Sequence, residues 1–388
     1  MPTSFPATPM APAPVLVHWI ENDLPCSARW RSESGMPSPK RVVIADDRTT
    51  ADAAYRLACE GTAMLWRGDF QNARQLLQAM ARRCDRKDHK AAGSPLEAFN
   101  FHRQAQSQRA RTLAMLLMPF DSNHTLPLRR APDVAAACHE AYGNADAPYV
   151  ASLRELLGLI GAHEWRKAGV DIAALGNRIH PHYGVFAPVR GEYVGLVAEM
   201  PLPSTTLAFD IGTGTGVLAA VLAQRGVRRV IATDQDPRAL TCAQENITRL
   251  GMDATIELLC ADLFPPGRAG LIVCNPPWLP ARPSSPIEYA MYDPESRMLR
   301  GFLDGLAAHL EEAGEGWLIL SDLAEHLGLR TRAELLEWIS TAGLKVLGRK
   351  DVRPIHPRAS DATDPLHAAR SAELTSLWRL GTGQAGTE

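Results

Sequence analysis

The chain lacks several features that would assign it to common protein classes. No apolar run is long enough to span a bilayer, and no basic stretch followed by an apolar core opens the chain, so we expect a cytoplasmic protein without a membrane partner. The seven cysteines are an odd number without a Cys-x-x-Cys pair, which predicts reduced thiols. With a formal net charge of −2, the chain as a whole has no electrostatic preference for nucleic acid.

What is present is the composition of an ordinary globular protein, and 388 residues are enough for two domains. Hydrophobic periodicity predicts strands and helices in both halves of the chain. The strands are expected at 41–45, 62–66, 207–211, 229–233, 270–274, 317–320, 344–347 and 374–379, with a further strand ending near 260. The helices are expected at 50–60, 70–83, 99–118, 150–169, 217–223 and 332–341.

These patterns predict an α/β protein in which a mainly helical or mixed α/β domain precedes a mostly parallel sheet. The expected segments are 1–40, partly disordered and rich in Pro and Ala over 1–14; 41–150, a substrate-recognition domain; 151–200, a helical connector and lead-in; 201–381, the α/β domain with the motifs below; and 382–388, a tail.

The most informative motif is Asn275-Pro276-Pro277-Trp278, which directly follows the predicted buried strand 270–274. Proline has no backbone N–H, so this stiff loop offers carbonyl oxygens without competing donors. Asn275 adds a side-chain acceptor and Trp278 adds a flat apolar face. The motif therefore predicts a socket for a planar group that carries an NH2, such as an amide or an aromatic amine, which must be oriented before it reacts.

A glycine-rich turn, Gly212-Thr213-Gly214-Thr215-Gly216, links the strand 207–211 to a helix. Glycines at alternate positions let a ligand approach the backbone N–H groups at the start of a helix. Asp234 ends the next strand, about 20 residues further on, where an acid can bind ribose hydroxyls. A glycine turn and an acid suit a dinucleotide equally well.

Three details favour a different ligand. Val217 stands where the dinucleotide pattern has its third glycine. Asp210 lies at the turn, where its charge would repel a pyrophosphate and attract an ammonium group. Asp262 follows the third strand of this domain and could accept a hydrogen bond from an adenine amine. A ligand with an amino-acid end, a ribose and an adenine fits all three acids, and S-adenosylmethionine is such a ligand.

Residues 184–322 resemble a class I S-adenosylmethionine-dependent methyltransferase of the "methyltransferase small" type, in particular the protein N5-glutamine methyltransferases that modify release factors and a ribosomal protein. The resemblance rests on segments that occur in the family's order: Val185–Glu192, Phe209–Gly216, Ala232–Leu240 with Glu245-Asn246, Asp262-Leu263-Phe264, Asn275–Pro280, and Tyr292–Glu295 through Gly301 and Gly305-Leu306.

The resemblance implies a Rossmann-like, seven-stranded sheet whose last strand is antiparallel. It also implies S-adenosylmethionine as cofactor, without a metal. Its motifs add Thr213, Gln235 and Leu263 to the cofactor contacts expected from Asp210, Gly212, Gly214, Gly216, Asp234, Asp262 and Asn275. The expected catalytic residues are Asn275, Pro276, Pro277 and Trp278. The Asn275 side chain and the Pro276 carbonyl would accept the two N–H hydrogens while Trp278 stacks on the target.

The substrate remains open. The glutamine enzymes usually carry Tyr where this chain has Trp278, and the region before residue 180 is longer than their small helical domain. The rRNA guanine-N2 methyltransferases share both loops and have a long N-terminal domain, and adenine-N6 methyltransferases use the same loop chemistry. The candidate partners are a release factor or ribosomal protein, or rRNA or another RNA. A non-catalytic cofactor-binding scaffold is the third possibility, and the intact Asn275 loop disfavours it. The sequence does not predict an oligomeric state.

Three further features allow two interpretations each. The basic residues between Arg82 and Arg130 form either a solvated face or a landing patch for RNA or a ribosomal surface. His180 and His182 have no Cys or carboxylate partner at ligand spacing, which favours a turn with surface histidines over a metal site. The loop 353–370, with His356, Arg358 and His367, should lie on the active-site side because it follows a parallel strand. It would contact substrate, or be a mobile surface loop.

Overall fold

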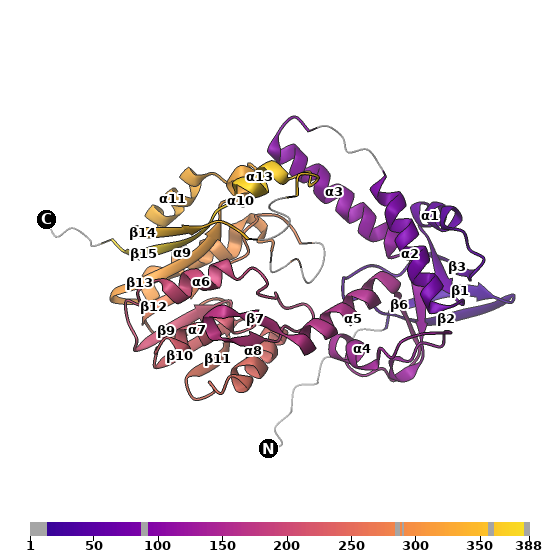
Figure 1. The fold of residues 1–388 in the computed structure, drawn as a ribbon, viewed down its shortest axis with the longest axis horizontal. Coiled ribbons are helices and arrows are strands. Elements are labelled where there is room, and N and C mark those ends of the chain that lie inside the picture. Colours follow the sequence, from indigo (N-terminus) through magenta and orange to yellow (C-terminus); the bar gives the residue numbers. More distant parts are fainter. Residues whose placement is uncertain (1–13, 87–91, 284–287, 289–290, 356–360, 384–388) are drawn as a thin grey trace, which may run out of the picture. The chain divides into compact units, whose positions relative to one another are not determined.

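The computed structural model describes residues 14–86, 92–283, 288, 291–355 and 361–383. The chain divides into two compact units (Figure 1). The first unit contains Met1–Lys87 and Gln108–Ile160, and the second contains Asp88–Ser107 and Gly161–Glu388. The units are therefore not consecutive along the chain. The prediction of disorder for residues 1–14 lies outside the described residues except for Pro14.

The first unit is built on a six-stranded sheet with the order β1-β2-β6-β5-β4-β3. Its strands are β1 (Leu16–Glu21), β2 (Leu24–Trp30), β3 (Arg41–Ala45), β4 (Thr62–Trp66), β5 (Leu116–Phe120) and β6 (Tyr149–Ser152). Its helical elements are α1 (Ala51–Cys59), α2 (Phe70–Asp85), η1 (Ser122–His124) and α4 (Ala135–Tyr142), together with parts of α3 (Pro95–Leu113) and α5 (Leu153–Ala168). Because β3, β4 and β5 are parallel, this unit is mixed α/β.

In the first unit, one sequence expectation was wrong and one hairpin was not predicted. The helix predicted over 99–118 ends at Leu113, and Leu116–Phe120 forms β5 instead. Every residue of β5 is buried and the strand lies between β4 and β6, so burial on both faces of a sheet outweighed the helical periodicity. The hairpin of β1 and β2 was missed. Its turn at Asn22 and Asp23 has positive φ angles of 52° and 61°, which suits these two residue types.

A buried carboxylate, Glu155, holds the loop after β2 in the first unit. Its side chain accepts hydrogen bonds from the Ser32 and Ser34 hydroxyls (both 3.0 Å), the Glu33 N–H (2.9 Å) and the Tyr142 hydroxyl (2.5 Å). Glu155 itself is only 8% exposed. An acceptor with this many donors is costly to remove, because several half-buried donors would lose a charged partner at once.

We therefore expect Glu155→Ala to lower the free energy of unfolding by about 3 kcal/mol, measured by urea denaturation. Glu155→Gln keeps one acceptor oxygen at the same place and should lose clearly less. If the two variants are equally stable, the donors find other partners and the network does not hold the loop.

The second unit is built on a seven-stranded sheet with the order β11-β10-β9-β12-β13-β15-β14. Its strands are β9 (Leu207–Ile211), β10 (Arg229–Asp234), β11 (Ile256–Cys260), β12 (Ala269–Cys274), β13 (Leu310–Ser321), β14 (Leu344–Val352) and β15 (Thr375–Thr382). Neighbouring strands from β11 to β13 are parallel, and β15 runs antiparallel to both β13 and β14. The predicted Rossmann-like sheet with an antiparallel last strand is thus confirmed.

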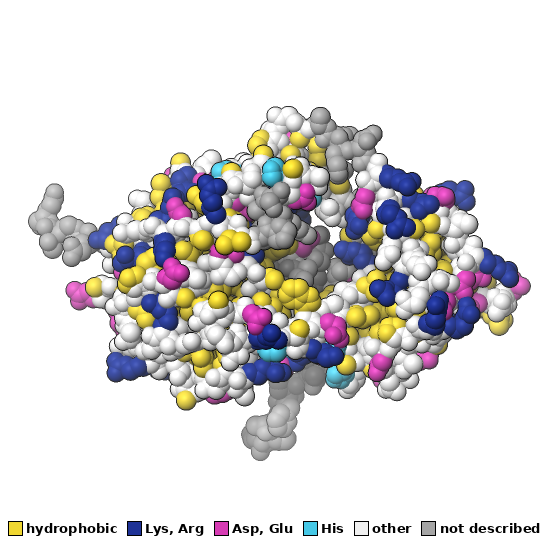
Figure 2. Space-filling view, viewed as in Figure 1, with side chains coloured by type: hydrophobic (Ala, Val, Ile, Leu, Met, Phe, Trp, Pro, Cys, Tyr) yellow, Lys and Arg dark blue, Asp and Glu magenta, His cyan; other side chains and the backbone are white. Residues whose placement is uncertain are grey.

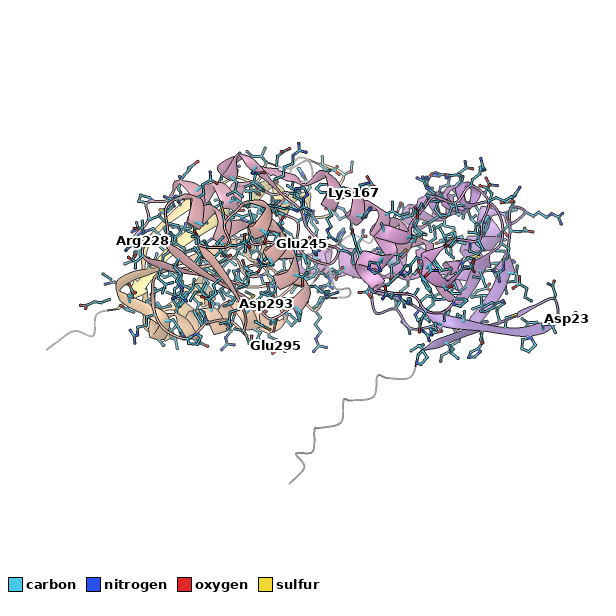
Figure 3. All side chains as sticks on the ribbon, turned by 90° about the horizontal axis from the view of Figure 1, so that it is seen from below. Asp23, Lys167, Arg228, Glu245, Asp293 and Glu295 are labelled. Carbon is cyan, nitrogen blue, oxygen red and sulfur yellow. The ribbon has the colours of Figure 1, made fainter. Side chains whose placement is uncertain are left out.

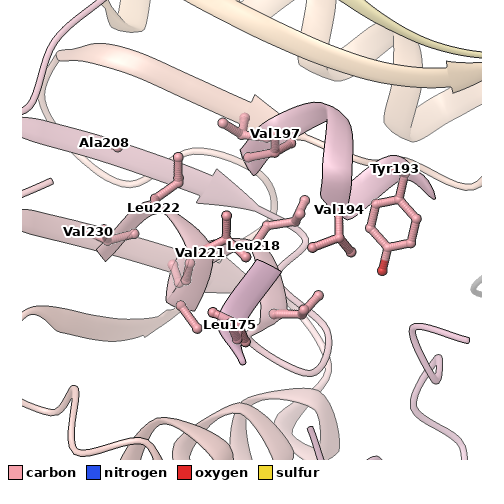
Figure 4. Packing of buried hydrophobic residues seen from close by; sticks show 14 of the residues in the cluster. Leu175, Tyr193, Val194, Val197, Ala208, Leu218, Val221, Leu222 and Val230 are labelled. Carbon is pink, nitrogen blue, oxygen red and sulfur yellow. The ribbon is translucent and has the colours of Figure 1, made fainter. Parts of the chain in front are cut away.

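Helices cover both faces of this sheet, and each face has its own buried cluster. The described helices that lie wholly in this unit are α6 (Glu192–Glu199), α7 (Val217–Gln224), α8 (Pro237–Arg249), α9 (Arg297–His309), α10 (Leu323–His326), α11 (Arg332–Thr341) and α13 (His367–Ala372), and α3 and α5 each contribute a part. On one face, residues of α6 and α7 pack over Ala208 and Val230 (Figure 4). On the other face, α9 and α11 pack over Phe209 and Ile272. A short hairpin, β7 (Val170–Ile172) and β8 (Asn177–Ile179), with η2 (Ala173–Leu175) between its strands, adds to the first cluster.

Within the parts of the chain that the structure describes, no helix is both long and apolar enough to cross a bilayer.

Candidate active site

Four strands of the second unit end at one level, and this brings the predicted site residues to one edge of the sheet. In the strand register, Ile211 of β9 lies opposite Thr233 of β10 on one side and Cys274 of β12 on the other. Asp234 lies opposite Cys260 of β11. The loops that follow these strands therefore begin side by side at the carboxyl edge, where ligands bind in parallel sheets.

The glycine turn between β9 and α7 has the backbone that only glycine adopts easily. Gly212, Gly214 and Gly216 all have positive φ, at 71°, 55° and 81°. At Gly216, an added Cβ would come within 3.3 Å of the Ala243 Cβ on α8, so this glycine also allows close packing. At Gly214, no atom lies within 4 Å of where a Cβ would be, so this part of the turn faces open space. Thr213 is buried, and its N–H donates to the Thr233 carbonyl over 2.8 Å.

Asp210 lies beneath the turn and is 1% exposed. Its Oδ2 accepts from the Thr213 hydroxyl (2.6 Å) and from the Ala219 N–H of α7 (3.1 Å). Burial raises the pKa of Asp210 to about 6, against the lowering effect of these two hydrogen bonds. In this structure the carboxylate holds the turn onto α7, and an ammonium contact stays a prediction.

The raised pKa of Asp210 has a consequence for stability. The ionised form is disfavoured in the folded chain, so we expect the contribution of Asp210 to stability to fall with a steady slope as the pH rises from about 4 to about 6 and to level off above that, by about 3 kcal/mol in total. Asp210→Asn should remove most of this slope in urea denaturation midpoints recorded across the window. The exposed Asp253, changed to Asn, is the control and should leave the slope in place. An unchanged slope in Asp210→Asn would show that another group titrates there.

Asp234 and its neighbours form the next part of the edge. The Asp234 Oδ2 accepts from the Gly214 N–H (3.0 Å) and its Oδ1 from the Asp236 N–H (2.9 Å), while burial raises its pKa. Gln235 is exposed. The Thr233 hydroxyl donates to the Leu263 carbonyl over 2.6 Å, and Leu263 has a positive φ of 75°. The glycine turn, Asp234 and Leu263 are thus joined by hydrogen bonds through β10.

Asp262 lies apart from this network. It is exposed, and its Oδ2 is 2.8 Å from the Arg297 Nη2 at the start of α9. An adenine contact for Asp262 remains a prediction, and such a contact would compete with Arg297.

In the loop after β12, Asn275 and Trp278 contact each other. The Trp278 Nε1–H donates to the Asn275 Oδ1 over 2.9 Å. Pro276 is buried, while Asn275, Pro277 and Trp278 are half-buried. Trp278 packs against both buried clusters, so its ring lies at the carboxyl edge of the sheet between the two faces.

The chain beyond this loop returns to support it. Leu279 forms an isolated parallel bridge with Tyr292, and the Asp293 N–H donates to the Leu279 carbonyl over 2.8 Å. The buried Asp293 carboxylate then accepts from the Met298 and Leu299 N–H groups (3.0 and 3.1 Å) and caps α9. Figure 3 shows Asp293 inside this unit and Glu295 at its boundary. These contacts tie the segment that begins at Tyr292 to the loop after β12.

Two glycines of α9 have a packing role at the same edge. A Cβ on Gly301 would come within 2.7 Å of the Leu263 Cδ1, and one on Gly305 within 2.5 Å of the Phe264 Cε2. The loop after β11 therefore packs directly on the α9 backbone.

Sequence reasoning assigned no role to Arg190, which contacts Trp278, or to the two carboxylates that hold Arg190. The Arg190 Cζ lies 5.2 Å from the centre of a Trp278 ring, and Arg190 bonds to the carboxylates of Glu192 (3.0 Å) and Glu373 (3.1 Å). Arg190 and Glu192 belong to the lead-in segment, whereas Glu373 is 183 residues further on. The sequence signal for this contact was weak: Arg190 and Glu192 are the two charged residues of the otherwise apolar segment Val185–Glu192.

The turn with His180 and His182 differs from the expected surface turn. His182 Nε2 lies 2.9 Å from the Glu245 Oε2, and the His182 side chain is only 14% exposed. The buried Asn246 accepts from the His180 N–H (2.7 Å) and donates to the Thr215 carbonyl (3.1 Å). The turn with the two histidines is thus held against α8 by Glu245 and Asn246. Asn246 also joins this turn to the glycine turn. Among the described residues, no three His, Cys, Asp or Glu side chains are grouped to hold a metal ion.

The basic region between Arg82 and Arg130 is largely paired with acids from elsewhere in the chain. In the first unit, ion pairs join Arg83 to Asp52, Arg109 to Asp85, Arg129 to Asp47 and Arg130 to Asp69, at 2.6–2.8 Å. Figure 2 shows Lys and Arg side chains interspersed with Asp and Glu over the part that Figure 1 labels α1, α2 and β3. In the second unit, Arg103 stacks on Tyr292 at 4.1 Å. This pairing favours the solvated-face interpretation; Lys87 and Lys90 lie outside the described residues.

The sheet order, the glycine turn and the Asn-Pro-Pro-Trp loop together define a domain of the class I S-adenosylmethionine-dependent methyltransferase type. The family model described as ribosomal protein L11 methyltransferase (PrmA) matches residues 197–276. This match confirms the resemblance that the motifs predicted, over the part of the chain that carries the glycine turn and the start of the loop.

Individual relatives have different targets in their names. A release factor glutamine methyltransferase from Cereibacter sphaeroides is 34% identical over 179 residues, covering 42% of this chain and 63% of the relative. A tRNA1(Val) (adenine(37)-N6)-methyltransferase from Bacteroides fragilis is 43% identical over 96 residues, covering 23% and 40%. A ribosomal protein L11 methyltransferase from Symbiobacterium thermophilum is 41% identical over 137 residues, covering 29% and 44%. The chain thus spans less than two thirds of the length of each relative.

Proposed function

We propose that this chain is an S-adenosylmethionine-dependent N-methyltransferase that acts on a planar amide or amine nitrogen, with glutamine N5 of a translation-related protein as the first candidate. One observation carries the proposal. The Asn275-Pro276-Pro277-Trp278 loop and the glycine turn begin at the ends of adjacent parallel strands, β12 and β9, with Cys274 opposite Ile211.

The residues at this edge suit the cofactor. The turn at Gly214 faces open space, so a ligand can approach its backbone without meeting a side chain. Each oxygen of the Asp234 carboxylate accepts one backbone N–H and has a second lone pair for a ribose hydroxyl. Asp210 and the turn would hold the amino-acid end, with Thr213, Gln235 and Leu263 nearby and Asp262 available to the adenine.

The chemistry needs positioning more than acid or base catalysis. When bound, S-adenosylmethionine would supply a methyl group on a sulfonium; the nitrogen lone pair of the target would form the new N–C bond, and the thioether product would keep the electron pair of the broken C–S bond. Asn275 Oδ1 and the Pro276 carbonyl would accept the two N–H hydrogens of the target, turning its lone pair toward the methyl group. The same acceptors favour the positive charge that develops on nitrogen until one proton leaves to water. Trp278 would cover the plane of the target.

The glutamine candidate is supported by the extent of similarity. The match to the release factor glutamine methyltransferase spans 179 residues, against 96 for the tRNA adenine enzyme. The segment from Tyr292 to Leu306, which resembles the glutamine enzymes, also supports the loop directly. The second candidate is an exocyclic amine of an RNA base, favoured by the large ring of Trp278, on which a nucleobase stacks well.

The test is transfer of a radiolabelled methyl group by the full chain onto release factors, ribosomes and total RNA, followed by separation of protein from RNA. Label on a protein glutamine supports the first candidate, and label confined to RNA replaces it with the second. If calorimetry shows that the cofactor binds but no fraction takes label, the chain is a cofactor-binding scaffold and the proposed activity is wrong.

A further inference from the structure

Trp278 resolves an ambiguity in the Asn275 side chain. The two ends of an asparagine amide have nearly the same shape, so a flipped amide would present donors where the proposed reaction needs an acceptor. The indole N–H can only donate, so the Asn275 atom that lies 2.9 Å from it must be the oxygen. One lone pair of that oxygen receives Trp278, and the other is left for a substrate N–H.

Trp278 is in turn held by Arg190. The guanidinium lies over a ring of the indole, with its Cζ 5.2 Å from the ring centre. Its Nε donates to Glu192 and its Nη2 to Glu373, so two anchors fix the plane of the group. The Arg190 side chain is 22% exposed, so the contact is partly shielded from water.

The anchors are themselves fixed. Glu373 is 1% exposed, and its Oε1 also accepts from the Ser321 hydroxyl at the end of β13 over 2.7 Å. The Ser321 oxygen accepts from the Leu323 N–H over 3.0 Å. The Glu192 side chain is 5% exposed. Removing two carboxylates and a guanidinium from water costs about as much free energy as their attraction returns, so this cluster adds little to stability. We therefore interpret it as a device that holds the guanidinium in one orientation.

We propose that Arg190 and Glu373 are positioning residues. Glu373 holds the Arg190 guanidinium, Arg190 holds the Trp278 ring, and the Trp278 N–H keeps the Asn275 oxygen turned toward the methyl-accepting nitrogen. This inference rests on the proposed function for its effect on turnover, but the contacts can be tested without any substrate.

The first test is independent of activity. In a proton–nitrogen NMR spectrum of the deuterated chain, the Trp278 indole signal is assigned by its loss in Trp278→Phe. We expect this N–H to exchange with solvent at least about 10-fold faster in Arg190→Lys and in Glu373→Gln than in the wild type, because opening of a local contact governs exchange. Unchanged exchange in both variants would overturn the proposal, whether or not the chain transfers methyl groups.

The second test uses turnover on whichever fraction accepts methyl groups. Arg190→Lys, Glu373→Gln and Trp278→Phe should each lower kcat about 10-fold and leave the KM for S-adenosylmethionine within about twofold, because they disturb orientation alone. The double variant Arg190→Lys with Trp278→Phe should lose no more than the single ones, because Arg190 acts through Trp278. If the fold-loss in kcat of the double variant equals the product of the two single fold-losses, Arg190 acts independently of Trp278 and the proposal is overturned.

A matched control variant distinguishes a loss of positioning from a general loss of stability. Arg332 makes the same kind of contact with another tryptophan: its Cζ lies 5.1 Å from the centre of a Trp378 ring, and its Nε bonds to Glu325 over 2.8 Å. We expect Arg332→Lys to leave both the Trp278 exchange rate and kcat unchanged. If it slows turnover as much as Arg190→Lys does, the loss reflects general weakening of the unit and the positioning role is wrong.

Discussion

Asn275→Ala is expected to lower turnover about 100- to 1000-fold, the usual effect of removing one preorganised hydrogen-bonding group at a developing charge. The variant keeps the Pro276 carbonyl but loses the acceptor that orients the second hydrogen of the target. The cofactor should bind with nearly unchanged affinity, because the residues proposed to hold most of it lie at or just beyond the carboxyl ends of β9, β10 and β11. Single-turnover kinetics together with isothermal titration of S-adenosylmethionine separate the two effects.

Asn275→Asp serves as the control for this prediction. It keeps an oxygen that can accept from the Trp278 N–H and from a substrate N–H, so it should retain clearly more activity than the alanine variant. If Asn275→Ala transfers methyl groups at the normal rate, the loop does not grip the target nitrogen and the proposed function loses its main support.

Asp234→Ala is expected to weaken S-adenosylmethionine binding about 100-fold, measured by isothermal titration. Hydrogen bonds to a charged acceptor contribute about 1.5–3 kcal/mol each, and the variant also leaves the Gly214 N–H without its acceptor. The effect should therefore combine the loss of ribose contacts with a looser glycine turn, and turnover at saturating cofactor should recover in part.

Asp253→Asn is the matched control for Asp234→Ala. Asp253 lies in the same unit, is exposed, and accepts from the Thr248 hydroxyl over 2.6 Å at the opposite end of α8 from Asp236. Its loss should leave cofactor affinity unchanged within about twofold. An affinity that also survives Asp234→Ala would mean that the cofactor does not lie along β10.

The second unit was more predictable than the first. Its central strands β9 and β12 are nearly continuous apolar runs, and they end in a glycine-rich turn and a polar motif, so strand, loop and helix follow there from local pattern. In the first unit, β5 carries the same apolar character but directly follows α3, with which its residues were merged. The β1–β2 hairpin was not predicted. Its strand β2 joins the sheet by pairing with β6, more than a hundred residues later in the chain, and such a distant pairing leaves no local signal.

The candidate site shows the same division between local and distant information. The positions of Asp210, Asp234 and Asn275 at strand ends follow from the motifs themselves. Their partners do not: Asp210 is held inside the turn by Thr213 and Ala219, and Asp262 is paired with Arg297. Basic residues that appeared unpaired along the chain are neutralised by acids such as Asp47 and Asp69, which only folding brings near.

By itself, the amino-acid sequence determined the class of domain, because glycine conformation, proline's missing N–H and strand periodicity act within a few residues of each other. Only the tertiary structure decided what surrounds Asn275: its oxygen accepts from Trp278, the Arg190 guanidinium lies over the Trp278 ring, and Glu373 accepts from Arg190. Hydrogen bonds and ring contacts act over a few ångströms in space, so spacing along the chain could not predict that Glu373 contacts Arg190 in the segment before β9.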